Sequence, residues 1–476
     1  MNSKNSSIAK EVAFGFLPVK KSERTFGFWD LLFIQVGIGL SSIFILTGGY
    51  IGTLLNAKEA IAVILLGNAI PILLYMPISV FFARYGVDTF IGFRSALGYL
   101  GTNITYVLFT LMTLGFIALF CFMTGKSAIQ VSEMIGIQNS LASVGIGAPF
   151  FAIASFFIAA FIAYKGPSAI KGLNWIGVPA ILMLLIGLLI ALFYKEGLSN
   201  LFALQPSAPY ESKAESVAVA LELSVGLGFS WLFYIGQYSR LAKNEKVAFS
   251  GGFWSYGVLV NVAAILGALS AIVVGSLEPT EWMLAIGGVS GGLIGLILLM
   301  VGNISASVFL IYSQAISFKT IFPRQKWGTA IAASLPAVIL MITPAFYDAY
   351  STFIAFVSYI LAVLGGIVVT DFFFVKKQSV SVRYLYDQYG MYKYWKGINP
   401  SAFISLVVGT ACYWLLYNPF TMDTSIAFLY MTAGLPTFFV SSVSYYMFAK
   451  YVFSFEADRY QAKTVNTEQA QKPVSL

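Results

Sequence analysis

Long apolar stretches alternate with short polar segments along most of the chain, from Trp29 to Phe448. A membrane-spanning helix needs about 20 predominantly apolar residues in a row. The pattern predicts an all-α integral membrane protein with about twelve spans, at 29–53, 60–83, 103–124, 143–164, 173–194, 217–237, 251–275, 290–315, 327–344, 352–375, 401–417 and 425–450. Residues 1–28 and 451–476 are expected to be polar tails.

Basic residues are concentrated in alternate polar segments. If the N-terminus lies in the cytoplasm, 24 of the 28 Lys and Arg residues fall in cytoplasmic segments. The other four are Lys58, Lys126, Lys195 and Lys213. Cytoplasmic loops are enriched in Lys and Arg. We therefore expect a multi-pass protein of the cell membrane, with the lipid bilayer around it and both termini cytoplasmic. The net charge of +8 then reflects topology, and a nucleic-acid partner is not expected.

The composition also restricts the chemistry. Hydrophobic residues make up 58% of the chain and charged residues 10%, whereas a soluble protein carries about 25% charged residues. The chain has no histidine, which is the commonest metal ligand and proton relay. It has no HExxH motif and no cluster of acidic residues inside the spans. We therefore expect no enzymatic activity, no cofactor and no metal beyond a coupling ion. The sequence makes no prediction of oligomeric state.

A six-residue motif occurs twice. Span 1 contains V-G-x-G-x-S at 36–41, and span 6 contains it at 225–230. Equivalent points lie five spans apart, an odd number, so the two copies run in opposite directions through the membrane. This is the pattern of an inverted repeat. Spans 1–5 (29–194) and spans 6–10 (217–375) are expected to form the two halves, and spans 11–12 (401–450) to be additional helices.

The motif favours a break in the helix. Glycine and serine weaken a helix, and irregular backbone in a membrane is tolerated where it lines a cavity. Half-helix ends then present partial charges to a substrate and a cation. The alternative is that the glycines allow neighbouring helices to approach closely. For a matched pair in spans 1 and 6, the broken helix is the favoured interpretation.

Further short motifs resemble the nucleobase–cation symport family 1, which comprises cytosine, hydantoin and allantoin permeases, and especially its bacterial cytosine permease branch. The resemblance extends from about Pro18 to Tyr446. The matching elements are Thr47–Gly49 with Ile51 and Gly52, Gly67–Asn68, Tyr85–Thr89 with Arg94, Gly98 and Gly101, Arg240–Lys246, Gly365–Gly366, Thr370–Phe373 and Gly397–Ala402. Families of this kind share the leucine-transporter fold, so the resemblance implies that fold.

The resemblance also implies site residues. For the substrate it indicates Phe116 and Thr113 in span 3, Gly228 and Phe229 at the span 6 break, and Ser41 at the span 1 break. For a cation it indicates Gly37 and Leu40 of span 1 with Ser305 and Ser307 of span 8, and Asn303 lies one turn earlier. Hydroxyl and carbonyl ligands without a carboxylate favour Na⁺ over H⁺ as the coupling ion.

Two positions depart from the family pattern. Span 3 has Phe116 where relatives often have Trp, and Val308, Phe309 and Leu310 follow the span 8 hydroxyls where relatives carry Asn or an acid. Both changes favour a ring that is less polar than cytosine. Glu222 is the acid placed deepest in the outer half of a span. It is a candidate for coupling or gating, because a carboxylate inside a membrane is costly; the alternative is that it faces water.

Together these features predict a secondary active transporter. It is expected to move a small neutral ring compound, such as a nucleobase, a hydantoin or a related heterocycle, together with a cation by alternating access. The alternative is an amino-acid or amine transporter on the same fold, in which half-helix N-termini bind the substrate carboxylate.

Overall fold

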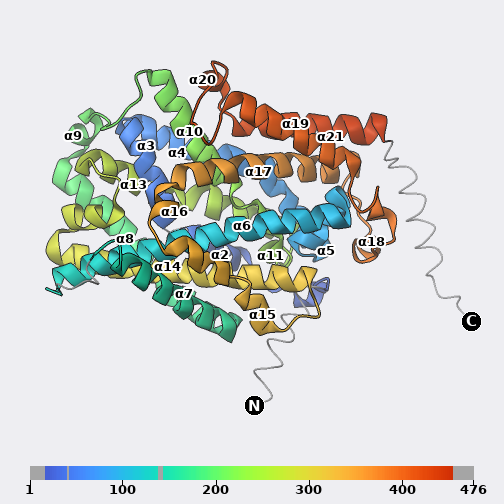
Figure 1. Ribbon diagram of the computed structural model, residues 1–476, viewed down its shortest axis with the longest axis horizontal. Helices are drawn as coiled ribbons and strands as arrows, with labels where there is room; N and C mark the ends of the chain where they lie inside the picture. Colours follow the sequence, from blue (N-terminus) through green and yellow to red (C-terminus); the bar gives the residue numbers. More distant parts are fainter. Residues whose placement is uncertain (1–16, 40–41, 138–142, 454–476) are drawn as a thin grey trace, which may run out of the picture.

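The computed structural model describes residues 17–39, 42–137 and 143–453, and most of them are helical (Figure 1). Helix lies within each of the predicted spans. The first five contain α2 (Phe28–Gly39) with α3 (Ser42–Leu54), α4 (Ala57–Tyr75) with α5 (Ser79–Tyr85), α6 (Thr89–Met134), α7 (Gly147–Lys165) and α8 (Pro167–Glu196). The next five contain α10 (Lys213–Phe229) with α11 (Ile235–Ser239), α12 (Glu245–Gly252) with α13 (Asn261–Val274), α14 (Pro279–Ile321), α15 (Trp327–Ala332) and α17 (Tyr350–Thr370).

The last two spans contain α19 (Pro400–Leu416) and α20 (Phe428–Met431) with α21 (Gly434–Met447). The connections carry α9 (Leu198–Ala203), α16 (Ala345–Asp348) and α18 (Val382–Tyr386). Short 3₁₀-helices are η1 (Lys21–Glu23), η2 (Met76–Ile78), η4 (Leu232–Tyr234), η6 (Leu335–Met341) and η8 (Met391–Lys393). Short π-helices are η5 (Phe253–Leu259), η7 (Asp371–Val375) and η9 (Phe448–Val452).

The lengths of these helices confirm an all-α membrane architecture. Within the described ranges, seven helical segments are long and apolar enough to cross a membrane, and α2 with α3 makes an eighth if the bent pair forms one span. The segment Trp327–Met341 and α19 are apolar but shorter. The count of twelve crossings stays a prediction.

Both copies of the repeated motif coincide with a helix end. The axes of Phe28–Gly37 and Ser42–Leu54 differ by 64°, and residues 40–41 between α2 and α3 lie outside the described residues. In span 6, α10 ends at Phe229 and helix resumes in η4 and α11. The motif therefore marks the interruption in both spans.

Glycines beyond the first break bring two helices into backbone contact. A Cβ atom at Gly48 would lie 1.8 Å from the carbonyl oxygen of Ala264, and one at Gly267 would lie 1.9 Å from that of Ile45. Real Cβ atoms do not approach so closely, so α3 and α13 pack together only because these positions carry no side chain. Close helix approach thus accounts for glycines outside the motif.

Helix α6 contains a kink that the hydrophobic pattern does not predict. Gly98 has φ of +81°, in the left-handed region that glycine adopts most easily. A neighbouring loop fills the gap in the helix, because the amide of Leu100 donates to the carbonyl of Gly397 over 2.8 Å. The kink separates a short helical segment, Thr89–Leu97, from the long helix of span 3.

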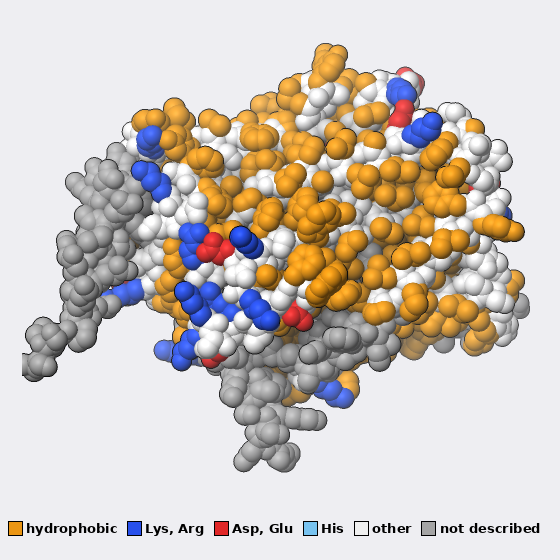
Figure 2. Space-filling view, turned by 180° about the vertical axis from the view of Figure 1, so that it is seen from behind, with side chains coloured by type: hydrophobic (Ala, Val, Ile, Leu, Met, Phe, Trp, Pro, Cys, Tyr) orange, Lys and Arg blue, Asp and Glu red, His pale blue; other side chains and the backbone are white. Residues whose placement is uncertain are grey.

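The surface agrees with a membrane setting. Figure 2 shows a broad hydrophobic face, with most of the visible Lys and Arg side chains gathered at its left. Large side chains such as Ile104, Val107 and Leu111 of α6 are about half exposed, as expected of a lipid-facing stripe. Four basic side chains of the described residues are buried instead, namely Arg94, Arg240, Lys319 and Lys376, and Lys376 pairs with Asp371.

Candidate functional site

An aromatic cluster lies directly after the span 6 break. The ring of Trp231 stacks on Tyr256 with centroids 4.7 Å apart and planes at 19°, and on Tyr234 at 5.0 Å and 28°. Phe309 of α14 and Tyr238 of α11 lie parallel to Trp231 at 6.1 and 6.3 Å. All five rings are buried or nearly so. The residues after the break therefore gather aromatic rings with nearly parallel planes inside the protein, stacked on one another.

The opposite break supplies a polar group to the same cluster. Gln35 of α2 is 2% exposed, and its Oε1 accepts hydrogen bonds from Trp231 Nε1 over 3.2 Å and from Ser255 Oγ over 3.1 Å. Gln35 stands one residue before the first V-G-x-G-x-S motif, and Trp231 one residue after the second. The helix that leads into the span 1 break thus meets the residue after the span 6 motif at an amide–indole contact, and this contact brings a neutral hydrogen-bonding group to the aromatic cluster.

Thr113 belongs to this cluster, and Phe116 lies close to it along the same helix. Thr113 Oγ1 and Tyr234 Oη are 3.0 Å apart and share a hydrogen bond. One turn further along α6, Phe116 contacts Phe353 of α17 edge to face, with centroids 5.0 Å apart. The structure therefore brings Thr113 to the span 6 break and sets Phe116 against span 10.

The other two residues predicted at the span 6 break pack against neighbouring helices. A Cβ atom at Gly228 would lie 2.9 Å from Pro71, and its carbonyl accepts a hydrogen bond from Tyr75 Oη over 2.6 Å. The ring of Phe229 stacks between Tyr75 at 5.9 Å and Phe438 at 5.8 Å. Phe229 thus packs against spans 2 and 12, whereas Trp231 lies in the aromatic cluster, and the substrate role of Phe229 stays a prediction.

The predicted cation residues lie around the span 1 break as far as they are described. Leu40 and Ser41 lie outside the described residues. Gly37 is buried, and a Cβ atom there would lie 2.5 Å from Val178 of α8. Ser305 and Ser307 are buried on α14, and Ser307 Oγ lies 3.5 Å from the sulfur of Cys121.

Asn303 connects the two predicted cation elements. Its Oδ1 accepts a hydrogen bond from Ser42 Oγ over 2.6 Å, at the first residue of α3. Its Nδ2 is buried and has no hydrogen-bond partner among the described residues. Asn303 therefore presents an amide oxygen to the start of α3, directly after the span 1 break. Ser307 lies one turn further along the same side of α14, whereas Ser305 lies on the opposite side, because residues two apart in an α-helix are about 200° apart around its axis.

Two groups of hydrogen bonds join the broken spans to neighbouring helices: span 6 to α14, and span 1 to α17. On the side that is predicted to be cytoplasmic, Gln237 Nε2 donates to Ser317 Oγ over 2.7 Å, and Tyr238 shares a 3.0 Å hydrogen bond with Ser313. On the opposite side, Tyr350 Oη contacts Thr47 Oγ1 and donates to the carbonyl of Ile43 over 3.2 Å. We call these the inner and outer closures. The names follow the predicted orientation, in which the basic residues lie in the cytoplasm.

Glu222 lies outside the aromatic cluster. It is buried on α10, two turns before the break, and its hydrogen-bond partners belong to α17, α19 and the start of α21. The structure therefore separates Glu222 from Gln35 and Trp231, and its surroundings are described below.

Comparison with known proteins agrees with this arrangement. A family model described as permease for cytosine/purines, uracil, thiamine, allantoin matches residues 18–441. The chain is 22% identical over 406 residues to a hydantoin permease of Microbacterium maritypicum, covering 80% of each chain. It is 22% identical over 362 residues to the cytosine permease of Escherichia coli K12, covering 75% of this chain and 80% of the relative.

Solved structures confirm the fold. The inward-facing conformation of Mhp1 superposes with a TM-score of 0.76 at 17% identity, covering 97% of this chain and 98% of that one. Mhp1 in a closed conformation with bromovinylhydantoin bound gives 0.74 at 18% identity, covering 94% and 95%. MhsT in complex with L-phenylalanine gives 0.53 at 16% identity, covering 87% and 96%.

These neighbours confirm the leucine-transporter fold that the resemblance implies, and the matched relatives are named as permeases. The family model covers most of the chain, including both breaks and the aromatic cluster. The chain therefore belongs to the family of permeases for cytosine/purines, uracil, thiamine and allantoin, and it is a membrane transporter rather than an enzyme.

Proposed function

We propose that this protein carries a small, neutral, planar heterocycle across the cell membrane together with Na⁺, by alternating access. The observation that carries the proposal is the aromatic cluster at the meeting point of the two breaks. Trp231 and Tyr256 offer stacking surfaces, and Gln35 offers an amide to the edge of a ring. A hydantoin or nucleobase has a flat face and a hydrogen-bonding edge.

The neutrality of the site favours a ring over an amino acid. Among the described residues, Trp231 stacks on Tyr234, Tyr238, Tyr256 and Phe309 and donates a hydrogen bond to Gln35, and none of these partners carries a charge. Bringing a zwitterion into a buried site without charged partners is costly. Similarity to a hydantoin permease and to Mhp1 with bromovinylhydantoin bound supports the same choice.

Na⁺ is proposed as the coupling ion on the chemistry of α14. The proposed ligands are the neutral oxygens of Asn303, Ser305 and Ser307 with carbonyls of the span 1 break, where Leu40 and Ser41 lie outside the described residues. Alternating access then requires the inner and outer closures to open in turn. The orientation proposed is the one that the basic residues predict, with both termini in the cytoplasm.

Uptake into proteoliposomes tests this proposal. Purified protein is reconstituted, and accumulation of radiolabelled hydantoins and nucleobases is followed under an imposed inward Na⁺ gradient. We expect accumulation of at least one ring compound, and its loss when the gradient is collapsed with a Na⁺ ionophore. Accumulation that follows an imposed proton gradient and ignores Na⁺ would show that the coupling ion is H⁺.

A further inference from the structure

Both oxygens of the buried Glu222 carboxylate are occupied by hydrogen bonds. Oε1 accepts from Ser358 Oγ and from Tyr413 Oη, each over 2.9 Å. Oε2 accepts from the backbone amides of Ala433 and Gly434, each over 2.9 Å. Four donors around one carboxylate make up for the water that the group loses on burial.

These donors join α10 to three other spans. Ser358 lies on α17, Tyr413 lies on α19, and Gly434 is the first residue of α21. The first amides of a helix have no partner within the helix, and its N-terminus carries a partial positive charge. Glu222 therefore caps α21 from a different span and joins span 6 to spans 10, 11 and 12.

The same helix is also bound to the first repeat. Ser224 Oγ of α10 donates to the carbonyl of Ile64 in α4 over 3.1 Å. A Cβ atom at Gly67 of α4 would lie 2.6 Å from Cβ of Ser224, so the two helices are in close contact. Before the span 6 break, α10 thus contacts span 2 through Ser224 and spans 10–12 through Glu222.

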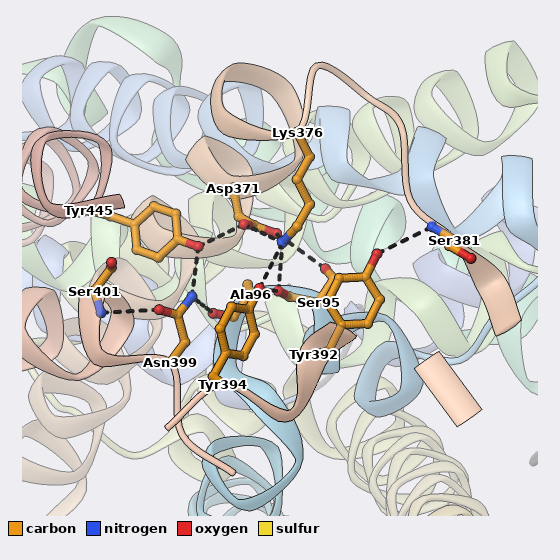
Figure 3. Close-up of polar contacts among 10 residues, drawn as sticks. All are labelled: Ser95, Ala96, Asp371, Lys376, Ser381, Tyr392, Tyr394, Asn399, Ser401 and Tyr445. Carbon is orange, nitrogen blue, oxygen red and sulfur yellow. Dashed lines mark hydrogen bonds and ion pairs between the residues drawn. The ribbon is translucent and has the colours of Figure 1, made fainter. Parts of the chain in front are cut away.

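Spans 11 and 12 are themselves fixed at their other end, as Figure 3 shows. Lys376 Nζ lies 2.6 Å from both oxygens of Asp371, and Tyr445 Oη of α21 donates to Asp371 Oδ1 over 2.7 Å. Asn399, the cap of α19, donates to Tyr445 Oη over 3.1 Å and to the carbonyl of Ala96 over 2.7 Å. A buried ion pair and its hydrogen bonds thus fasten α19 and α21 to α17 and α6.

The groups around the Asp371–Lys376 ion pair donate hydrogen bonds to the backbone carbonyls that precede the kink in α6. The carbonyl of Ser95 accepts from Lys376 Nζ and from Tyr394 Oη, each over 2.6 Å, and the carbonyl of Leu97 accepts from the amide of Asn399 over 3.0 Å. These are the carbonyls that the break at Gly98 leaves without helical partners. The cationic Lys376 at this C-terminus also complements the helix dipole. Spans 11 and 12 are therefore anchored to the long helix of span 3.

We propose that Glu222 is a positioning residue, a fixed point at which the outer half of span 6 stays attached to spans 11 and 12 while the inner and outer closures open. Releasing Glu222 would leave a carboxylate unpaired in apolar surroundings, which is far more costly than breaking a neutral hydrogen bond such as Gln237–Ser317. Spans 11 and 12 then act as the support of this fixed point. The proposal rests on the transport function proposed above.

Cross-linking tests whether α10 and α20 stay together during transport. Val219 of α10 and Phe428 of α20 line one small pocket beside Glu222. Both are replaced by cysteine, with Cys412→Ser and the buried Cys121 retained, and are joined by a short bifunctional thiol reagent. We expect uptake at the rate of the same protein before cross-linking. Loss of uptake that returns when the cross-link is cleaved would overturn the proposal.

A matched cross-link across the outer closure, Thr47→Cys with Tyr350→Cys, is expected to stop uptake reversibly. Uptake by the protein before cross-linking is measured in the same vesicles, so a failure of the transport function appears there, separately from a failure of the fixed point.

Glu222→Gln separates positioning from proton coupling. The amide keeps the size of the side chain but presents an N–H group where one oxygen accepts hydrogen bonds. We expect substrate exchange and gradient-driven uptake to fall by the same factor. Unchanged exchange with loss of driven uptake would show that Glu222 carries a coupling proton, and the proposal would be wrong.

Discussion

Trp231 and Gln35 flank the two repeated motifs, and the sequence alone did not single them out. The V-G-x-G-x-S pattern reports where backbone leaves the helix, and serine is its one polar side chain. The Phe229 prediction followed from the family resemblance, and in the structure that side chain stacks between Tyr75 and Phe438. The signal that could have identified Gln35 and Trp231 was their position directly next to each motif.

Replacing Trp231 tests the stacking surface. Trp231→Ala removes the ring that lies against Tyr256. Stacking of a heterocycle on an aromatic side chain contributes about 1–3 kcal/mol, so we expect the dissociation constant to rise by about fivefold or more. Titration calorimetry with the transported ring compound measures it. Trp254→Ala, at a tryptophan that is 51% exposed, is the matched control, and equal losses in both variants would contradict the assignment.

Ser307→Ala tests the predicted cation site. Loss of one oxygen that binds a charged group costs about 1.5–3 kcal/mol. We therefore expect the Na⁺ concentration for half-maximal substrate binding to rise by about tenfold or more. Ser127→Ala serves as control, because that buried serine donates only to the carbonyl of Met123 within its own helix. An unchanged Na⁺ dependence in Ser307→Ala would remove this residue from the site.

At the scale of helices, the hydrophobic pattern located the spans but not their irregularities. The interruptions of spans 1 and 6 were predicted because the motif is repeated. The kinks at Gly98 and Gly288 were not, since each lies in an apolar run that also contains ordinary helical glycines. The kink at Gly98 depends on Gly397 and Asn399, which are nearly 300 residues away in the chain.

The contact between α3 and α13 predicts the effect of a single methyl group. Gly48→Ala places Cβ against the carbonyl of Ala264, where the backbones must separate. Overpacking of this kind costs about 1–3 kcal/mol, so we expect a lower melting temperature in detergent. Gly187→Ala on α8 meets nothing within 4 Å and should leave the melting temperature unchanged or raised. The same melting temperature for both variants would contradict the close packing.

For the whole molecule, charge and periodicity predicted the class of protein, and the repeat predicted its internal organisation. They did not predict a role for spans 11 and 12, because that role depends on four donors from three helices meeting at Glu222. They also did not predict the closures, since serine, threonine and tyrosine are common in membrane helices and only their pairing carries meaning.

The inner closure gives a prediction about conformational populations. Gln237→Ala removes the hydrogen bond to Ser317, worth about 1 kcal/mol, so the equilibrium should shift about fivefold toward the inward-open state. Spin labels are attached at the exposed positions Lys246 and Arg324, and the distance between the two labels is measured by double electron–electron resonance. Tyr350→Phe, which loosens the outer closure, should change this distance distribution in the opposite sense. An identical distribution in all three proteins would contradict the assignment of the closures.

The central claim is that a neutral ring compound and Na⁺ bind together at the two breaks. Thermal unfolding of the purified protein against a panel of nucleobases, hydantoins and amino acids, with and without Na⁺, tests it most directly, because a ligand that binds the native state raises the melting temperature. The account predicts that at least one ring compound stabilises the protein, and does so more strongly in Na⁺. Stabilisation by amino acids alone, with none by any ring compound, would contradict it.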